Sequence, residues 1–361
     1  MKLTTLRLAA LLAVTVSIGL AFQARVRADD DDDDDKPAKA AGELPLKLVK
    51  DVPLSGKPAR LDYQSLDPRT HLLFIAHLGD GFVTVYDVEK EKVVKEIRNV
   101  EQVHGVLAIS SLSRCYASAT GAKQVVAIDE ATLEITARMP GGGYPDGMAW
   151  DSEDQKLYVS DESGGGEVVI DTKTNKKVAT IDIGGEAGNT QYDPVSKRIY
   201  VNNQSTNELV AIDPRTDKVV ERTKVAGGEG NHGMLIEPAR RLAFLACQGN
   251  SKLVVIDMKT MKVASSFSIG RGNDVLAFDP GLRRLYVACE SGTVSVFELG
   301  EGTSQEVKKI GEAFLAKNAH TVAVDPATHR VYFPLKDVGG KPTLRVMEPV
   351  TSSGTPAKSF H

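Results

Sequence analysis

The chain has 361 residues, 42% of them hydrophobic and 25% charged, a composition typical of a globular protein that buries a large core. Four of the 44 Lys and Arg lie in the first 28 residues, so the rest of the chain has 40 basic residues against 48 Asp and Glu. Seven of these acids form one continuous run. A body this close to neutral has no excess of positive charge, so we expect no nucleic-acid partner and no polybasic attachment to anionic lipid.

The first 28 residues have the parts of a secretory signal peptide. A positively charged start is followed by an apolar run at 8–22, and Val26 and Ala28 are small residues placed before a cleavage site. The run is short for a membrane span, which needs about 20 residues. We predict that residues 1–28 are removed, leaving a periplasmic or secreted protein that begins near Asp29 and has no membrane span. An uncleaved membrane anchor is the alternative.

Residues 29–43 begin with seven consecutive aspartates. Like charges repel one another, so we predict a disordered acidic leader here. Weak collection of calcium is the alternative, because hard cations prefer carboxylate oxygen. The polar stretch 351–361 is predicted to be a flexible C-terminal tail.

An internal repeat of about 42 residues follows the leader. An aspartate ends an apolar strand at Asp87, Asp129, Asp171, Asp213 and Asp257, with spacings of 42, 42, 42 and 44 residues. In four of these cases a Thr stands three residues later. A carboxylate in this position caps nearby backbone N–H groups, which is the chemistry of a short turn between two strands.

Two further series repeat with the first. Asp-Pro or Glu-Pro turns occur at 67–68, 193–194, 237–238, 279–280 and 325–326, and apolar strands with a central aromatic follow at 73–75, 157–159, 199–201, 285–287 and 331–333. Each unit therefore contains four short strands separated by turns. This pattern is typical of one blade of a β-propeller.

Seven first strands can be counted, beginning near Leu61, Gly105, Gly147, Thr190, Gly233, Val275 and Thr321. The seventh unit has only three strands, and a strand at 46–52 is available to supply its fourth. An open ring would leave two unpaired sheet edges. We therefore predict an all-β fold over residues 44–350: a seven-bladed β-propeller with four-stranded antiparallel blades, closed by the N-terminal strand.

The strands Leu157-Tyr158-Val159-Ser160 and Ile199-Tyr200-Val201-Asn202-Asn203 resemble YVTN-type propeller repeats. With the turns described above, the stretch from about 46 to 349 is similar to the YncE-like family of exported bacterial seven-bladed propellers. The resemblance implies a periplasmic or secreted binding protein, and it implies no particular activity.

One position gathers polar residues when the blades are aligned. The residue that enters the first strand is Asp62, His104, Asp146, Asn189, His232, Asp274 or His320. The first strand is innermost in a propeller, so we expect these side chains around one mouth of the central channel. His104, His232 and His320 are the predicted metal ligands, because imidazole with carboxylate suits a divalent transition metal.

Three interpretations of this ring remain open: a metal ion, a polar small ligand, or solvation of the channel. The turn after each second strand returns to the same mouth, and its candidates for outer contacts are His77, Asp161, Glu162, Asn202, Asn203, Gln248, Glu290 and Lys336. Arg60 stands beside Asp62 and could hold an anionic group.

Three classes of function are compatible with the sequence. The leading interpretation is a monomeric binding protein that holds a metal ion, small ligand or partner protein at the mouth. A metal-assisted lactonase or lyase using the same His and Asp residues is the second, and a non-catalytic scaffold is the third. Cys115, Cys247 and Cys289 lie in apolar runs, so we predict buried thiols that need no disulfide.

Overall fold

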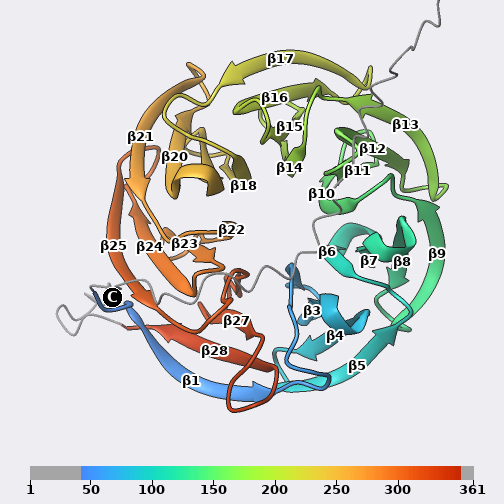
Figure 1. Ribbon diagram of the computed structural model, residues 1–361, viewed down its shortest axis with the longest axis vertical. Helices are drawn as coiled ribbons and strands as arrows, with labels where there is room; N and C mark the ends of the chain where they lie inside the picture. Colours follow the sequence, from blue (N-terminus) through green and yellow to red (C-terminus); the bar gives the residue numbers. More distant parts are fainter. Residues whose placement is uncertain (1–41, 351–361) are drawn as a thin grey trace, which may run out of the picture. The chain divides into compact units, whose positions relative to one another are not determined.

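The computed structural model describes residues 42–350. The predicted signal peptide, the leader up to residue 41 and the predicted tail lie outside the described residues. Residues 42–350 form seven four-stranded antiparallel sheets arranged as the blades of a ring (Figure 1). The predicted seven-bladed β-propeller is therefore confirmed.

The strands follow the predicted units. Blade 1 contains β2 (Gln64–Asp67), β3 (Leu72–His77), β4 (Phe82–Asp87) and β5 (Lys92–Arg98); blade 2 contains β6 (Val103–Ile109), β7 (Arg114–Ala119), β8 (Gln124–Asp129) and β9 (Glu134–Pro140); blade 3 contains β10 (Pro145–Asp151), β11 (Lys156–Asp161), β12 (Gly166–Asp171) and β13 (Lys176–Asp182). Blade 4 contains β14 (Ala187–Asp193), β15 (Arg198–Asn203), β16 (Glu208–Asp213) and β17 (Lys218–Lys224); blade 5 contains β18 (Asn231–Glu237), β19 (Leu242–Cys247), β20 (Lys252–Asp257) and β21 (Lys262–Ser268). Blade 6 contains β22 (Asn273–Asp279), β23 (Arg284–Cys289), β24 (Thr293–Leu299) and β25 (Val307–Phe314), and blade 7 contains β26 (Ala323–Val324), β27 (Val331–Leu335), β28 (Thr343–Pro349) and β1 (Leu46–Pro53).

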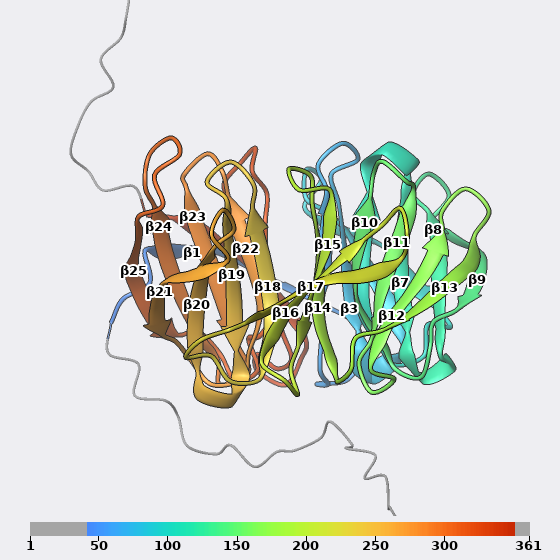
Figure 2. The same ribbon diagram turned by 90° about the horizontal axis from the view of Figure 1, so that it is seen from above.

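The four helices of the described range are single 3₁₀ turns of three residues: η1 (Leu78–Asp80), η2 (Ser110–Leu112), η3 (Thr120–Ala122) and η4 (Gln248–Asn250). Within residues 42–350, none of them has the length and apolar character that crossing a membrane requires. Viewed edge-on, the ring has its turns on two opposite faces (Figure 2).

The turns form through the chemistry predicted for them. Asp129 Oδ1 accepts hydrogen bonds from the backbone N–H of Ala131 (3.1 Å) and Thr132 (2.8 Å), and Asp171 does the same two and three residues further on. These bonds satisfy donors that the strand ladder leaves unpaired. The turn is therefore encoded locally in every unit that carries the aspartate.

Aromatic side chains at one position of the second strand pack the blades together. The seven equivalent residues are Phe74, Tyr116, Tyr158, Tyr200, Phe244, Tyr286 and Tyr332, all nearly inaccessible to solvent. Each belongs to an apolar cluster in a ring of similar clusters. Burying one such ring is worth about 1.5–3 kcal/mol, so the repeat supplies the same stabilisation to every blade.

The N-terminal strand closes the ring, as predicted. β1 pairs antiparallel with β28, from Leu46 opposite Pro349 to Pro53 opposite Thr343. Figure 1 shows the blue β1 lying outside the red β28. The guanidinium of Arg345 on β28 donates to both carboxylate oxygens of Asp51 on β1, at 2.8 and 2.7 Å.

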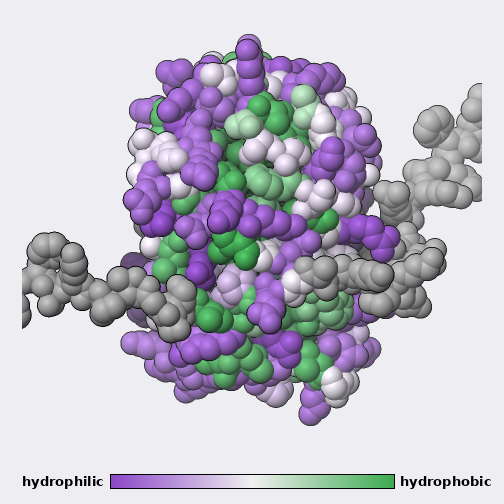
Figure 3. Space-filling model, turned by 90° about the vertical axis from the view of Figure 1, so that its left-hand side faces the viewer, coloured by the Kyte–Doolittle hydropathy of each residue, from purple (hydrophilic) through white to green (hydrophobic). Residues whose placement is uncertain are grey.

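The outermost strands alternate between half-buried and exposed side chains, as in β17 and β21. Figure 3 shows the side that carries β21 and β25, where hydrophilic and small hydrophobic surfaces are interspersed. Cys115, Cys247 and Cys289 are buried thiols within the apolar clusters, which confirms their predicted burial.

Candidate functional site

A bulge in the innermost strand sets the geometry of the channel mouth. In β6, β10, β14, β18 and β22 the pairing with the second strand shifts just after the first residue. A bulge leaves residues outside the ladder and redirects their side chains. His104, Asp146, His232 and Asp274 all occupy this irregular segment.

Glycine follows the bulged residue where neighbouring innermost strands approach most closely. A Cβ at Gly105 would lie 2.1 Å from the carbonyl oxygen of Asp146, and one at Gly233 would lie 1.9 Å from that of Asp274. No side chain fits at these distances. The glycines therefore bring the mouth residues of adjacent blades together.

The predicted alignment is one residue wrong in blade 4. Ala187 pairs with Asn203 and Thr190 with Val201, so the residue equivalent to Asp274 is Gly188, and Asn189 follows it. A Cβ at position 188 would lie 2.9 Å from the carbonyl oxygen of His232, which explains the glycine. Six blades therefore place Asp or His at the aligned position, while the Asn189 side chain reaches the channel from the next position.

Three of these residues converge into one buried group, here called the mouth group: Asp62, Asp274 and His320. One ligand atom from each lies within 4.8 Å of the other two, and the residues are 1%, 2% and 0% exposed. Both carboxylate oxygens of Asp62 and Nε2 of His320 lack a hydrogen-bond partner within the described chain. Nε2 of His320 and Oδ1 of Asp62 are 3.6 Å apart.

Two basic side chains border the mouth group. Arg60 lies with Nε 3.3 Å from Asp62 Oδ2 and Nη2 3.8 Å from Asp274 Oδ2. Its Nη1 donates to Glu290 Oε1 at 2.9 Å. On the other side, His232 Nε2 lies 3.1 Å from Asp274 Oδ1. Asp274 is thus shared between the mouth group and His232.

The titratable groups at the mouth differ in the direction of their pKa shifts. Burial favours the neutral carboxyl of Asp62, but the charge of Arg60 and the nearby imidazole of His320 outweigh it and hold the pKa of Asp62 below its usual range. For His232, burial favours the neutral ring, yet the charge of Asp274 raises the pKa of His232 to about 10. Asp146 differs, because burial and then the charges of Glu162 and Asp62 raise its pKa well above the usual range.

The negative charge of Asp146 is less well compensated than that of Asp62. Asp146 is buried, and its Oδ1 has no hydrogen-bond partner in residues 42–350. Ionisation of a buried carboxyl in a low-dielectric site is costly, and the nearby His232 offsets only part of this cost for Asp146. A bound cation would lower this cost.

His104 is held differently from the other two predicted metal ligands. Its Nδ1 lies 2.9 Å from Gln102 O and from Thr120 Oγ1, and its Nε2 lies 3.0 Å from the hydroxyl of Tyr144. Both ring nitrogens therefore have protein partners, and His104 is not part of the mouth group.

The candidates for outer contacts have separate roles. Glu290 contacts Arg60, and Glu162 Oε1 lies 4.0 Å from His232 Nδ1, so these two reach the mouth. Asn202 instead supports the backbone there, since its Nδ2 donates to the carbonyl of His232 at 2.9 Å. His77 is buried against Phe82 with ring centroids 4.4 Å apart, away from any mouth contact in this structure.

Sequence reasoning missed Tyr63, which crosses the channel. Its hydroxyl donates to Oδ1 of Asn189 in blade 4 and lies 3.4 Å from Asp274 Oδ1 in blade 6. A cavity of about 270 Å³ continues along the channel beside Tyr63, lined by innermost strands. Blade 1 has tyrosine where blades 2, 3 and 5 have Gly105, Gly147 and Gly233, and this difference was the available signal.

The comparisons with known proteins support the fold of this chain but no particular function. No family model matches the chain, and no curated protein sequence matches it. A chain of Kuenenia stuttgartiensis hydrazine synthase is 15% identical with a TM-score of 0.69, covering 80% of this chain and 96% of that chain. A chain titled U3-55K is 9% identical (TM-score 0.70, covering 82% and 98%), and one from a mitotic checkpoint complex is 12% identical (TM-score 0.70, covering 96% and 98%). Such different proteins share one architecture, so the likeness carries no activity to this chain.

Proposed function

We propose that this propeller is a binding protein whose mouth group binds a divalent transition-metal ion. The observation that carries the proposal is the convergence of Asp62, Asp274 and His320 within 4.8 Å, with Asp62 and the Nε2 of His320 left without hydrogen bonds in the described chain. Buried polar atoms are normally satisfied, and unsatisfied ones that face each other need a partner.

The donor set suits an ion of intermediate softness. Two carboxylate oxygens and one imidazole nitrogen are ligands that zinc and manganese both accept. Three protein ligands leave coordination positions open, and these would face the mouth, where a small ligand with an oxygen donor could complete the shell. The pKa of the neighbouring Asp146, which burial and the charges of Glu162 and Asp62 raise, is in keeping with a bound cation.

The predicted signal peptide and the resemblance to the YncE-like family favour a protein that acts outside the cytoplasm. Among the described residues, no contact specifically favours the lactonase or the scaffold interpretation over binding.

Metal binding can be measured directly. Purified protein is stripped with a chelator, and the binding of Zn²⁺ and Mn²⁺ is followed by calorimetry and by elemental analysis after dialysis. We expect one ion per chain, and at least a tenfold loss of affinity in Asp62→Asn and in His320→Gln. His71→Asn is the matched control, because His71 occupies an exposed turn at the end of β2 away from the mouth and asparagine tolerates its positive φ of 58°. Equal binding by the parent and the Asp62→Asn/His320→Gln double variant would refute the proposal.

A further inference from the structure

The face opposite the mouth carries a second repeated arrangement. An acidic residue ends the first strand of most blades, and the turn after it contains a residue with positive φ. In blade 5 this turn residue is Arg241, whose Nη1 lies 2.8 Å from both carboxylate oxygens of the buried Asp193 of blade 4. In blade 7 it is His329, whose Nδ1 lies 2.9 Å from Asp279 of blade 6. At these two interfaces a basic side chain of one blade thus contacts the acid of the blade before it.

Blades 3 and 4 carry an equivalent acid and an equivalent basic residue, but these two side chains do not pair. Asp151 ends β10 as Asp193 ends β14, and it is 1% exposed. Lys197 holds the position of Arg241, with a φ of 55°, but its Nζ pairs with Glu153 at 2.8 Å. Asp151 Oδ1 accepts the backbone N–H of Glu153 at 2.9 Å, and the hydroxyl of Tyr192 also interacts with this carboxylate. Among the described residues, no basic side chain forms an ion pair with Asp151.

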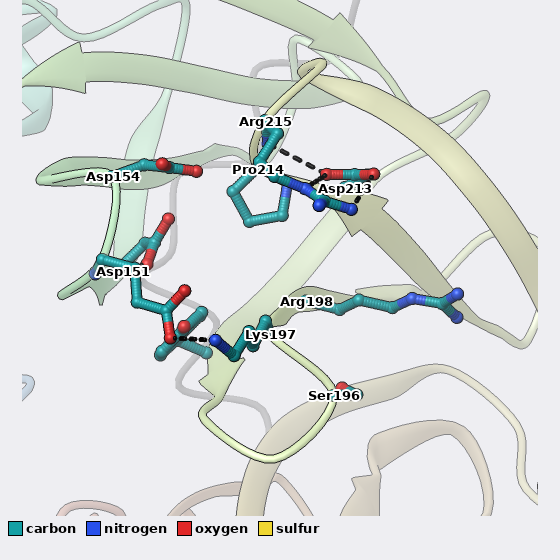
Figure 4. A pocket seen from close by; sticks show the side chains of 10 residues that line it. Asp151, Asp154, Ser196, Lys197, Arg198, Asp213, Pro214 and Arg215 are labelled. Atoms are coloured by element: carbon teal, nitrogen blue, oxygen red, sulfur yellow. Dashed lines mark hydrogen bonds and ion pairs between the residues drawn. The ribbon is translucent and has the colours of Figure 1, made fainter.

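A pocket of about 240 Å³ lies beside Asp151, here called the blade 3–4 pocket (Figure 4). It is lined by Asp151 and Asp154 from blade 3 and by Tyr192 and Asp213 from blade 4, among others. Figure 4 shows Lys197, Arg198 and Arg215 at its edges.

The basic side chains at the edge are engaged elsewhere. Lys197 pairs with Glu153, Arg198 with Glu221 at 3.0 Å, and Arg215 with Asp213 at 3.3 Å. The buried Asp151 therefore has a carboxylate oxygen beside an open pocket and no cation of its own. Burial raises the pKa of Asp151, although hydrogen bonds from Glu153, Asp154 and Tyr192 act in the opposite direction.

We propose that the blade 3–4 pocket binds a guanidinium group, held by Asp151 as Arg241 is held by Asp193. Between blades 4 and 5, the guanidinium of Arg241 binds the equivalent carboxylate of Asp193. A carboxylate in this position is therefore a suitable acceptor for a guanidinium. A guanidinium presents planar donors to a carboxylate and stacks on aromatic rings, and the ring of Tyr192 lines the pocket. The source is either a free guanidinium compound or an arginine side chain of a partner.

Two variants test the proposal from opposite directions. Asp151→Asn removes the charged acceptor, and Lys197→Arg restores the residue type found at position 241, so that the chain fills the pocket itself. Binding of methylguanidinium chloride and of the peptide acetyl-Gly-Arg-Gly-amide is measured by calorimetry at low salt. We expect the parent to bind, and each variant to bind at least tenfold more weakly. Lys197→Arg should also raise the melting temperature. Asp129→Asn, an exposed turn acid in blade 2, controls for the change in net charge.

The outcomes separate clearly. Peptide binding at least tenfold tighter than methylguanidinium assigns the site to an arginine of a partner, and equal binding assigns it to a free compound. Undiminished binding in Asp151→Asn would overturn the proposal, as would the absence of binding to the parent at 50 mM of either probe.

Discussion

Removal of the closing strand should cost the propeller most of its stability. The perturbation compares a chain that begins at Lys57 with a control that begins at Leu44, which retains β1. Leu46 and Leu54 are 7% and 5% exposed, and burying each leucine is worth about 1.5–3 kcal/mol. Half-buried Val49 and Val52 add a smaller amount.

The summed loss is about 4–8 kcal/mol, to be compared with the total stability of about 5–15 kcal/mol that folded domains have. β28 would also lose its hydrogen bonds to β1 and become an unpaired edge strand. Urea unfolding followed by the fluorescence of Trp150, the single tryptophan, measures the effect. We expect the Lys57 chain to unfold at less than half the urea concentration of the control, and a synthetic peptide of residues 44–56 to restore part of the difference. Equal midpoints for the two chains would refute the closure argument.

Three further predictions concern other parts of the chain. Burial and the neighbouring Asp67 raise the pKa of Glu130 to about 8, so the folded state keeps a proton that the unfolded state loses near pH 4.5, and stability falls as pH rises between these values. Glu130→Gln should therefore gain about 2–4 kcal/mol over the parent between pH 5 and pH 9 in chemical unfolding, and a constant difference would contradict this. Gly233→Ala should destabilise the fold by about 2 kcal/mol or more in the same assay, because its Cβ would meet the carbonyl oxygen of Asp274. We also predict export with cleavage of the signal peptide, so the sequence of the mature protein should begin at or near Asp29 in N-terminal sequencing, and a product that retains the first residue would indicate an anchor.

The blades and their closure could be predicted because their determinants are local. An aspartate such as Asp129 makes its turn with residues two and three positions away, and the aromatic of each second strand marks a buried position. Repetition of these signals at about 42 residues leaves few alternatives to a propeller. Counting strands then showed that the seventh unit lacked one, and the N-terminus could supply it.

The register inside the mouth could not be read in the same way. From the sequence alone, either Gly188 or Asn189 could align with the mouth residues of the other blades. Only the pairing of Ala187 and Thr190 with β15 decides between them. The bulge that carries the site is a defect in the ladder, and its exact length depends on how closely the neighbouring blade packs.

The sequence by itself determined the repeat, the number of blades and the residue types at the mouth, since each depends on chemistry within one unit. The tertiary structure alone decided that Asp62 and His320 meet Asp274, while His104 binds Thr120 and Tyr144 instead. It also decided that Lys197 pairs with Glu153 and not with Asp151. These contacts join different blades, and distances between blades follow from packing around the whole ring rather than from spacing along the chain.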